Sequence, residues 1–169
     1  RERRPIVRVG RVEILLRRSY QFNPLTKLPA APYLHRQINA RLAQNQPTSV
    51  VYADIDHFRP YNQAYGHTAG DRVLLQAAHL LVETLPAQGA FVSHLGGDDF
   101  IAVLTPETAE TFAQTIVEHF RELREQFYTP EDLGRKHILV EGRRGEQRPA
   151  PLMTLSAAMV SNDRRVLIN

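Results

Sequence analysis

Apolar residues along the chain follow two periodicities, one typical of helices and one typical of strands. Spacings of three and four place apolar side chains on one face of a helix, whereas short β-branched and apolar runs favour buried strands. The helical pattern covers residues from about 32 to a break at 44–47, then 57–65, 69–85 and 106–127, and the strand pattern covers 48–54, 90–95, 99–104 and 152–160. This order predicts an α+β fold in which a central, mostly antiparallel sheet of about four strands is flanked by helices.

Three segments interrupt these patterns and predict turns or loops. Two prolines hold residues 23–29 (NPLTKLP) out of a helix. Gly96-Gly97 separates two strand-like runs, and such a pair predicts a hairpin because tight hairpin turns need positive φ. Residues 128–151 are polar and rich in Gly, Pro and Arg, so we expect a long excursion that holds a short hairpin around Ile138–Val140.

The first residues of the chain combine many arginines with an apolar stripe. The stripe consists of Val9, Val12, Leu16 and Tyr20, which fit one face of a helix. Residues 1–18 hold seven Arg and two Glu, which gives them a net charge of +5. Since the whole chain has a net charge of +3, the remaining residues have a net charge of −2. We interpret residues 1–21 as a basic linker helix that follows another domain, and residues 22–169 as the main domain. The alternative is an arm that binds a membrane surface, a nucleic acid or a partner.

The composition excludes several classes of protein. The chain has no cysteine, which rules out disulfides, cysteine nucleophiles and cysteine-based zinc sites. No apolar run approaches the roughly 20 residues that span a bilayer, so we expect no membrane insertion and a cytoplasmic location. The charge of +3 hints at nucleic acid, but the basic excess belongs to the arm, and we expect no nucleic-acid partner for the mildly acidic main domain.

Two pairs of acidic residues lie at the ends of predicted strands. Asp54 ends the strand predicted over 48–54, Asp56 follows two residues later, and Asp98 and Asp99 follow the glycine pair of the hairpin. Such positions can bring carboxylates within about 5 Å of one another, where they repel unless a cation joins them, and Mg²⁺ prefers such oxygen ligands. The alternatives are that Asp56 caps the following helix and that Asp98 and Asp99 are ordinary turn residues.

Four short motifs follow one another along the main domain. They are residues 23–29 (NPLTKLP), 54–71 (DIDHFRPYNQAYGHTAGD), 95–100 (LGGDDF) and 153–156 (MTLS). In this order and spacing they resemble the signatures of the GGDEF domain family, the diguanylate cyclases, from about residue 22 to 160. The resemblance implies a fold similar to that of nucleotidyl cyclases and the polymerase palm, with a ferredoxin-like core.

The resemblance implies a metal site and a pair of catalytic acids. Asp54 and Asp98 would bind Mg²⁺, or Mn²⁺, through their carboxylates, and the carbonyl of Ile55 would help. Asp98 and Asp99 would be catalytic, with Asp99 close to the metal and to the attacking 3′-hydroxyl.

A binding site for GTP is implied as well. Asn62 and Asp71 would recognise guanine, which suits their chemistry because a carboxylate accepts from the N1–H and 2-amino groups while an amide both donates and accepts. The remaining contacts would come from a helix start and from the glycine turn, at His57, Phe58, Gly96 and Gly97.

The implied reaction joins two GTP molecules into cyclic di-GMP and releases two pyrophosphates. Each 3′-oxygen attacks the α-phosphorus of the other nucleotide, and metal ions activate the hydroxyl and neutralise the triphosphate. Because one domain binds one GTP, two copies must face each other, so the resemblance implies a homodimer. It also implies an N-terminal sensor or receiver domain in the full-length protein.

The sequence departs from the family pattern at five places. Asp99 stands where Glu is usual, which shortens the side chain by about 1.3 Å. Asn23 replaces a usual Asp, and Arg59 replaces a common Lys. Residues 87–90 (AQGA) lack both charges of the family's R-x-x-D product-inhibition motif. The last helix of the family, which carries a phosphate-binding Lys and Arg, would follow Asn169, so we expect a C-terminally incomplete domain. The alternative function is a degenerate GGDEF domain that binds GTP or serves as a dimerisation or regulatory module.

Overall fold

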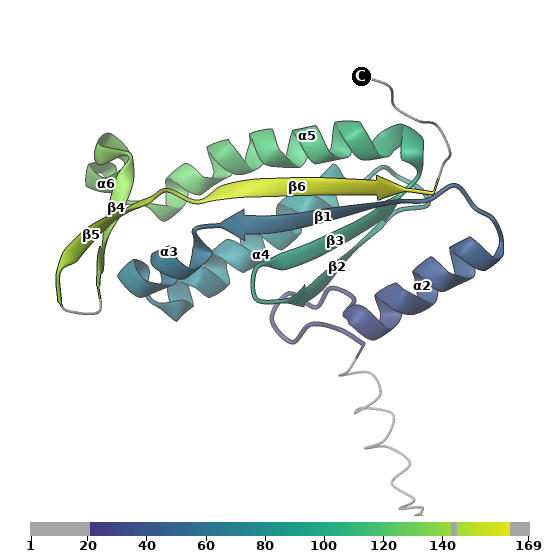
Figure 1. The fold of residues 1–169 in the computed structure, drawn as a ribbon, viewed down its shortest axis with the longest axis horizontal. Helices are drawn as coiled ribbons and strands as arrows, with labels where there is room; N and C mark the ends of the chain where they lie inside the picture. The colour runs from purple at the N-terminus through teal and green to yellow at the C-terminus, as the bar shows by residue number, and fades with distance from the viewer. Residues whose placement is uncertain (1–20, 143–144, 163–169) are drawn as a thin grey trace, which may run out of the picture.

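Helices and strands follow one another in mixed order along the chain in the computed structural model, which describes residues 21–142 and 145–162 (Figure 1). In chain order the elements are α2 (Ala31–Ala43), β1 (Ser49–Asp56), α3 (Phe58–Tyr65), α4 (His67–Thr84), β2 (Phe91–Gly96), β3 (Asp99–Leu104), α5 (Pro106–Leu123), the 3-10 turn η1 (Arg124–Phe127), α6 (Pro130–Arg135), β4 (His137–Glu141), β5 (Gln147–Pro151) and β6 (Thr154–Ser161). The predicted α+β class is confirmed. The linker helix predicted for residues 1–21 lies, except for its last residue, outside the described residues. None of the described helices is long and apolar enough to cross a membrane.

One four-stranded sheet forms the centre of the fold, with the strand order β2-β3-β1-β6 (Figure 1). Every neighbouring pair is antiparallel, as the sequence predicts. The central strand β1 places Asp54 opposite Asp99 of β3 on one side and opposite Ser156 of β6 on the other. This order is that of a ferredoxin-like core, and β4 and β5 pair with each other in a separate two-stranded sheet.

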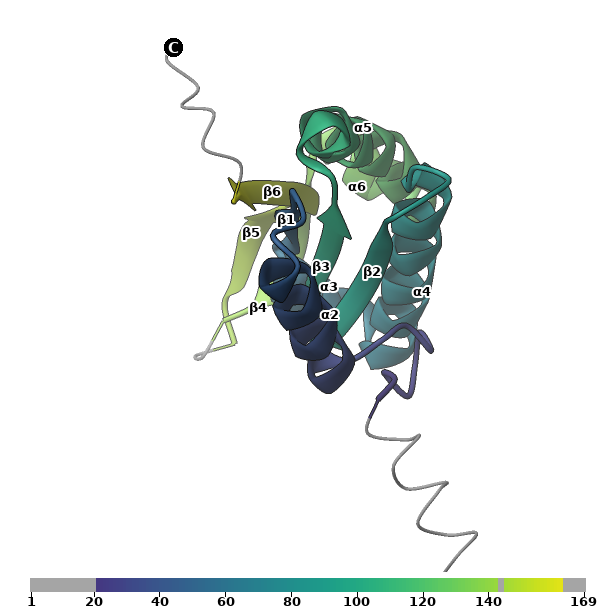
Figure 2. The same cartoon turned by 90° about the vertical axis from the view of Figure 1, so that its right-hand side faces the viewer.

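The two faces of the four-stranded sheet differ in what covers them. Successive side chains of a strand point to opposite faces, and on β1 Val51, Ala53 and Ile55 are buried while Tyr52 and Asp54 between them are more exposed. Helices α4 and α5 lie together on the buried face (Figure 2). Their core residues are Val73, Ala77, Leu81, Phe112, Ile116 and Phe120. Asp54 and Asp99 therefore lie on the opposite, more open face.

Several element boundaries differ from the predictions by a few residues, and three of these differences have a clear local reason. β1 continues to Asp56 because this residue still pairs with Thr154 of β6. α4 begins at His67, directly after Gly66, whose φ of 85° ends α3. The helix predicted over 106–127 ends with α5 and continues as the tighter 3-10 turn η1.

The excursion over residues 128–151 is more regular than its composition indicates. The short hairpin predicted around Ile138–Val140 is confirmed, and it extends over the whole of β4 and β5. The helix α6 was not predicted, although the sequence holds its start signals. Pro130 occupies its first turn, and the hydroxyl of the preceding Thr129 accepts a hydrogen bond from the Asp132 N–H at 3.2 Å.

Three tyrosines attach this excursion to α3. Tyr61 and Tyr65 of α3 stack with ring centroids 4.7 Å apart, and Tyr128 meets both rings edge-on at 5.4 and 5.7 Å. The Tyr61 hydroxyl donates to the carbonyl of Phe127 at 3.1 Å, and the Met153 N–H donates to the Tyr128 hydroxyl at 2.8 Å. Each aromatic pair adds about 0.5–1.5 kcal/mol beyond its buried area. The excursion therefore fixes α3, the helix that begins two residues after β1.

Candidate active site

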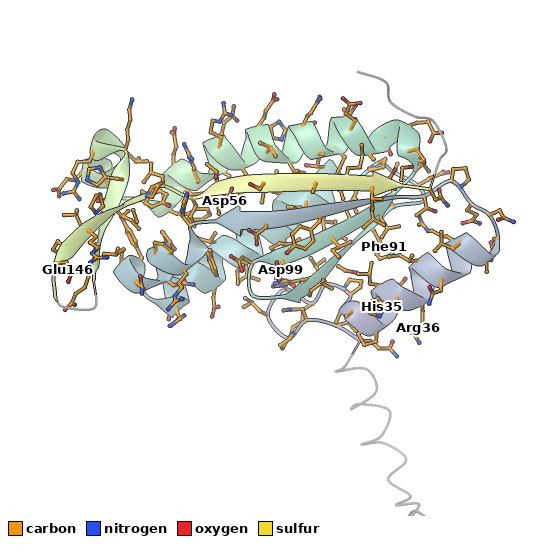
Figure 3. All side chains as sticks on the ribbon, viewed as in Figure 1. His35, Arg36, Asp56, Phe91, Asp99 and Glu146 are labelled. Carbon is orange, nitrogen blue, oxygen red and sulfur yellow. The ribbon has the colours of Figure 1, made fainter. Side chains whose placement is uncertain are left out.

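An acidic cluster lies where β1 ends beside the hairpin between β2 and β3. Asp54, Asp98 and Asp99 each have a carboxylate oxygen that lies within 4.8 Å of those of the other two. The pairing of β1 with β3 sets Asp54 directly opposite Asp99, and the turn residue Asp98 joins them. Figure 3 labels Asp99 at the start of β3. The prediction that these carboxylates meet is confirmed.

The turn that carries Asp98 needs its glycines for conformation. Gly96 and Gly97 have φ values of 138° and 60°, a region that other residues adopt only at a cost. A Cβ atom at either position would meet nothing within 4 Å, so space is not the constraint. The register of β2 and β3 shifts between His94 and Gly96, and this irregularity aims the turn.

A buried histidine, His94, holds the same turn through a hydrogen bond to its backbone. Its Nε2 lies 3.0 Å from the carbonyl oxygen of Gly97 and its Nδ1 lies 3.0 Å from the hydroxyl of Thr26. Burial lowers the pKa of His94, so the neutral ring donates from Nε2 to the carbonyl and accepts the Thr26 hydroxyl at Nδ1. The imidazole ring of His94 also stacks on the ring of Phe100, with the two ring centroids 4.3 Å apart. The segment 23–29 is thereby connected to the acidic turn, a link that sequence reasoning missed.

The cluster concentrates negative charge. Burial, and then the neighbouring Asp98 and Asp99, raise the pKa of Asp54 above its ordinary value. Within the described residues, no Lys, Arg or His forms an ion pair with any of these three carboxylates. Such a set of oxygen ligands without a protein counter-ion fits a hard divalent cation.

Tyr52 is a residue of this site that sequence reasoning missed. It precedes Asp54 by two positions on β1 and so shares its face. Its hydroxyl donates a hydrogen bond to Oδ1 of Asp99. This bond, with burial and the surrounding carboxylates, raises the pKa of Tyr52 to about 12, so the hydroxyl keeps its proton and remains a donor. The alternation of side chains along β1 was the available signal, because it predicts that Tyr52 lies on the same face as Asp54.

Asp56 has a different role from the one that its position before a helix indicates. The hydroxyls of Thr154 and Ser156 on β6 donate to its Oδ2 at 2.7 and 2.6 Å. The residue at the N-cap of α3 is His57, with φ of 62°, so the alternative that Asp56 caps this helix is wrong. Asp56 instead ties the end of β1 to β6 (Figure 3).

The expected guanine-binding residues lie on α3 and α4. Asn62 packs against Gly70, where a Cβ atom would overlap the Asn62 side chain. The Oδ1 of Asn62 is buried against Gly70 and has no hydrogen-bond partner among the described residues. Asp71 follows Gly70 on the first turns of α4 and is exposed. The close packing at Gly70 places Asn62 beside the residue that directly precedes Asp71.

The start of α3 carries the remaining expected contacts. Phe58 is buried in the core, and its ring reaches Gly70, so its side chain forms a wall and not a polar contact. His57 is exposed. Its left-handed conformation turns the chain between β1 and α3. Arg59, also exposed, follows on the first turn of α3.

Strand order, acidic cluster and the adjoining helix pair together define an α+β domain with a ferredoxin-like core and a candidate cation site at one end of its sheet. The sequence model of the family described as "Diguanylate cyclase, GGDEF domain" matches residues 21–146, and the chain belongs to this family.

Individual relatives give the same result. The chain is 32% identical over 115 residues to the signaling protein YkoW of Bacillus subtilis (strain 168), covering 63% of this chain and 14% of that protein. It is 33% identical over 103 residues to the diguanylate cyclase DgcP of Pseudomonas aeruginosa (strain PAO1), covering 59% of this chain and 15% of that protein. The chain thus spans about one seventh of the length of these relatives.

Solved structures show the same fold. The GGDEF domain of DgcB from Caulobacter crescentus, in complex with c-di-GMP, superposes with a TM-score of 0.61 at 20% sequence identity. The match covers 85% of this chain and 78% of that one.

Proposed function

We propose that this chain is the catalytic domain of a diguanylate cyclase, which condenses two GTP molecules into cyclic di-GMP. The observation that carries the proposal is the meeting of Asp54, Asp98 and Asp99 within 4.8 Å beside a glycine turn, in a chain of the GGDEF family. Similarity to a protein named as a diguanylate cyclase supports it.

In this proposal the acidic cluster holds a divalent cation, Mg²⁺ or Mn²⁺. Asp54 and Asp98 would bind it through their carboxylates, together with the carbonyl of Ile55. Bound there, the metal would lower the pKa of the 3′-hydroxyl and neutralise charge on the triphosphate. Asp98 and Asp99 are the catalytic aspartates in this proposal, and Asp99 would act as the general base that accepts the proton of the attacking hydroxyl.

The nucleotide would extend from this cluster along the start of α3 toward α4. The backbone N–H groups of His57 and Phe58 would donate to phosphate oxygens, and the bare backbone of Gly96 and Gly97 would let the nucleotide approach. Guanine would end at the helix pair. There the half-buried side-chain amide of Asn62 would hydrogen-bond to the base, and the Asp71 carboxylate would accept hydrogen bonds from it.

The proposal includes a homodimer, because each domain supplies one GTP and the two nucleotides must react with each other. It also includes a cytoplasmic location, where GTP is available, and an N-terminal sensor or receiver domain in the full-length protein. The small share of the relatives that the chain spans supports additional domains.

Incubation of the purified protein with GTP and Mg²⁺ or Mn²⁺, followed by chromatography, tests the proposal. We expect cyclic di-GMP from the unaltered protein and none from Asp98→Ala. Because residues 87–90 lack the charges of the inhibitory motif, added cyclic di-GMP should not slow the initial rate through that site. A dimeric sample that forms no more product than Asp98→Ala would refute catalysis.

The second candidate is a degenerate domain that binds GTP, or nothing, and regulates a neighbouring domain. The short Asp99 favours it, because general-base geometry tolerates little displacement. Titration with a non-hydrolysable GTP analogue separates the two candidates. Tight binding without turnover supports the regulatory module, and ready turnover of GTP refutes it.

A further inference from the structure

The hydrogen bond between Tyr52 and Asp99 joins the two strands that carry the acidic cluster. Tyr52 pairs with Ile101 across the β1–β3 ladder, and Asp99 lies two residues before Ile101 on the same face. The tyrosine therefore reaches the aspartate diagonally, a separation that an aromatic side chain can span. The ring lies on the open face with 39% of its surface exposed, and its hydroxyl ends on Oδ1 of Asp99.

We propose that Tyr52 is a positioning residue, whose hydroxyl holds the short Asp99 side chain in its working orientation at the acidic cluster. This inference rests on the proposed function. Asp99 occupies the position at which the family usually has the longer Glu, and Tyr52 acts through its contact with this carboxylate.

The contacts of Asp99 explain why one hydroxyl has this effect. Among the described residues, Tyr52 supplies the one hydroxyl or N–H group that donates to the Asp99 carboxylate. Its other polar neighbours are Asp54 and Asp98, which repel it. Without the hydroxyl, repulsion turns the carboxylate away from the cluster. With it, Oδ1 is engaged, and Oδ2 stays beside the metal-binding carboxylates and available to the attacking hydroxyl.

A four-protein comparison tests this role through two readouts. The proteins are the unaltered chain, Tyr52→Phe, Asp99→Glu and the double variant. The first readout is Mn²⁺ affinity without nucleotide, from the electron paramagnetic resonance signal of free Mn²⁺, and the second is kcat and KM for GTP. Asp99 lies within 4.8 Å of the proposed metal ligands Asp54 and Asp98. Because loss of an outer partner of a metal site weakens binding about 10- to 100-fold, we expect Tyr52→Phe to weaken Mn²⁺ binding by about tenfold. We also expect kcat to fall by about tenfold, with KM changed less than about twofold.

The decisive comparison is the effect of Tyr52→Phe in a protein that also carries Asp99→Glu. A glutamate carries its carboxylate about 1.3 Å beyond the hydroxyl, so Tyr52→Phe should change Mn²⁺ affinity less than about twofold there. Tyr33→Phe is the matched control, because it removes a phenol hydroxyl from α2, where the ring meets Phe91, and should leave both readouts unchanged. Thermal unfolding should show that all variants remain folded.

The outcomes separate this inference from the proposed function. Equal losses from Tyr52→Phe in both backgrounds, no loss in either, or no Mn²⁺ binding by the unaltered protein would each overturn the positioning role. If the unaltered protein makes no cyclic di-GMP, the proposed catalysis fails. The Mn²⁺ comparison alone then decides the role of Tyr52.

Discussion

Two Tyr–Asp pairs in this domain have the same chemistry and opposite surroundings. At the excursion, Tyr65 donates to Asp132, which also accepts from the Thr129 hydroxyl at 3.1 Å and is paired with the Arg135 guanidinium. At the open face of the sheet, Tyr52 donates to Asp99, whose other polar neighbours are carboxylates. A hydrogen bond between a tyrosine and an aspartate thus does not by itself identify a ligand-binding site. The charges around the pair distinguish the two cases.

The pKa values follow this difference. The hydrogen bond from Tyr65, with those from Arg135 and Thr129, holds the pKa of Asp132 below its usual range. Burial and the nearby Asp98 and Asp99 raise the pKa of Asp54 in the acidic cluster. The first environment favours the ionised carboxylate by itself, whereas the second favours it only when a cation is added. The first is therefore a structural anchor and the second a site for a ligand.

The strongest test of this contrast is Asp54→Asn. We expect it to reduce cyclic di-GMP formation by at least about 100-fold, because a bound metal contributes several kcal/mol to such reactions. In the absence of metal, the same change should leave the melting temperature unchanged or raise it, since it removes a repelling charge. Product formation is measured by chromatography, and melting by circular dichroism in a chelator. A variant that loses stability and keeps activity would reverse our assignment.

Asp132→Asn should have the opposite pattern. It removes the charge that Arg135 pairs with and replaces one accepting oxygen of the buried Asp132 side chain with an amide group, so we expect a loss of about 1–3 kcal/mol in the free energy of unfolding. Mn²⁺ affinity should stay within about twofold, since Asp132 is not in the acidic cluster. Urea denaturation gives the stability. Glu131→Gln is the matched control, because this exposed neighbour also pairs with Arg135, at 2.9 Å, and should cost at most about 0.5 kcal/mol. Equal losses from both variants would show that Asp132 is an ordinary surface charge.

The pH dependence of stability should distinguish the two aspartates by sign. Asp132 has a lowered pKa in the folded state, so its contribution is present above the unfolded pKa of about 3.9 and is lost as the pH falls through the folded pKa. Asp54 has a raised pKa, so in metal-free protein its contribution is present below about 3.9 and is lost as the pH rises through the folded pKa. Urea midpoints between pH 7 and 3 measure both effects against the two Asn variants. A stability gap between the unaltered protein and Asp132→Asn that does not narrow toward pH 3 would contradict the anchoring role.

The sequence predicts one of these environments and misses the other. The meeting of Asp54 with Asp99 follows from a strand end and a glycine turn, both of which are local signals. The contact of Tyr52 with Asp99 depends in addition on the register between β1 and β3, which the sequence pattern does not specify. The helix periods were sufficient to place α4 and α5 because each buries one continuous apolar stripe.

The excursion shows where local patterns fail. Its helix α6 has six residues, too few to show a period, and its start signal at Thr129 lies in a polar run that resembles a loop. Its attachment to α3 depends on Tyr128 meeting Tyr61 and Tyr65 more than sixty positions earlier, which no short window contains. The support of the turn by His94 fails for the same reason, since its partner Thr26 is 68 positions away.

The smallest expected effect comes from Tyr65→Phe, and it gives the closest comparison with Tyr52→Phe. Arg135 and the Thr129 hydroxyl still contact Asp132 in this variant, and the ring still stacks on Tyr61, so we expect a loss of about 1 kcal/mol in the free energy of unfolding. Mn²⁺ affinity should not change. Tyr52→Phe should show the reverse, with weaker Mn²⁺ binding and little loss of stability, because its hydroxyl serves a cluster that gains its stabilising charge from a metal. If Tyr65→Phe weakened Mn²⁺ binding as much as Tyr52→Phe, the effect would come from losing any tyrosine hydroxyl, and the surrounding charge would no longer explain the difference between the pairs.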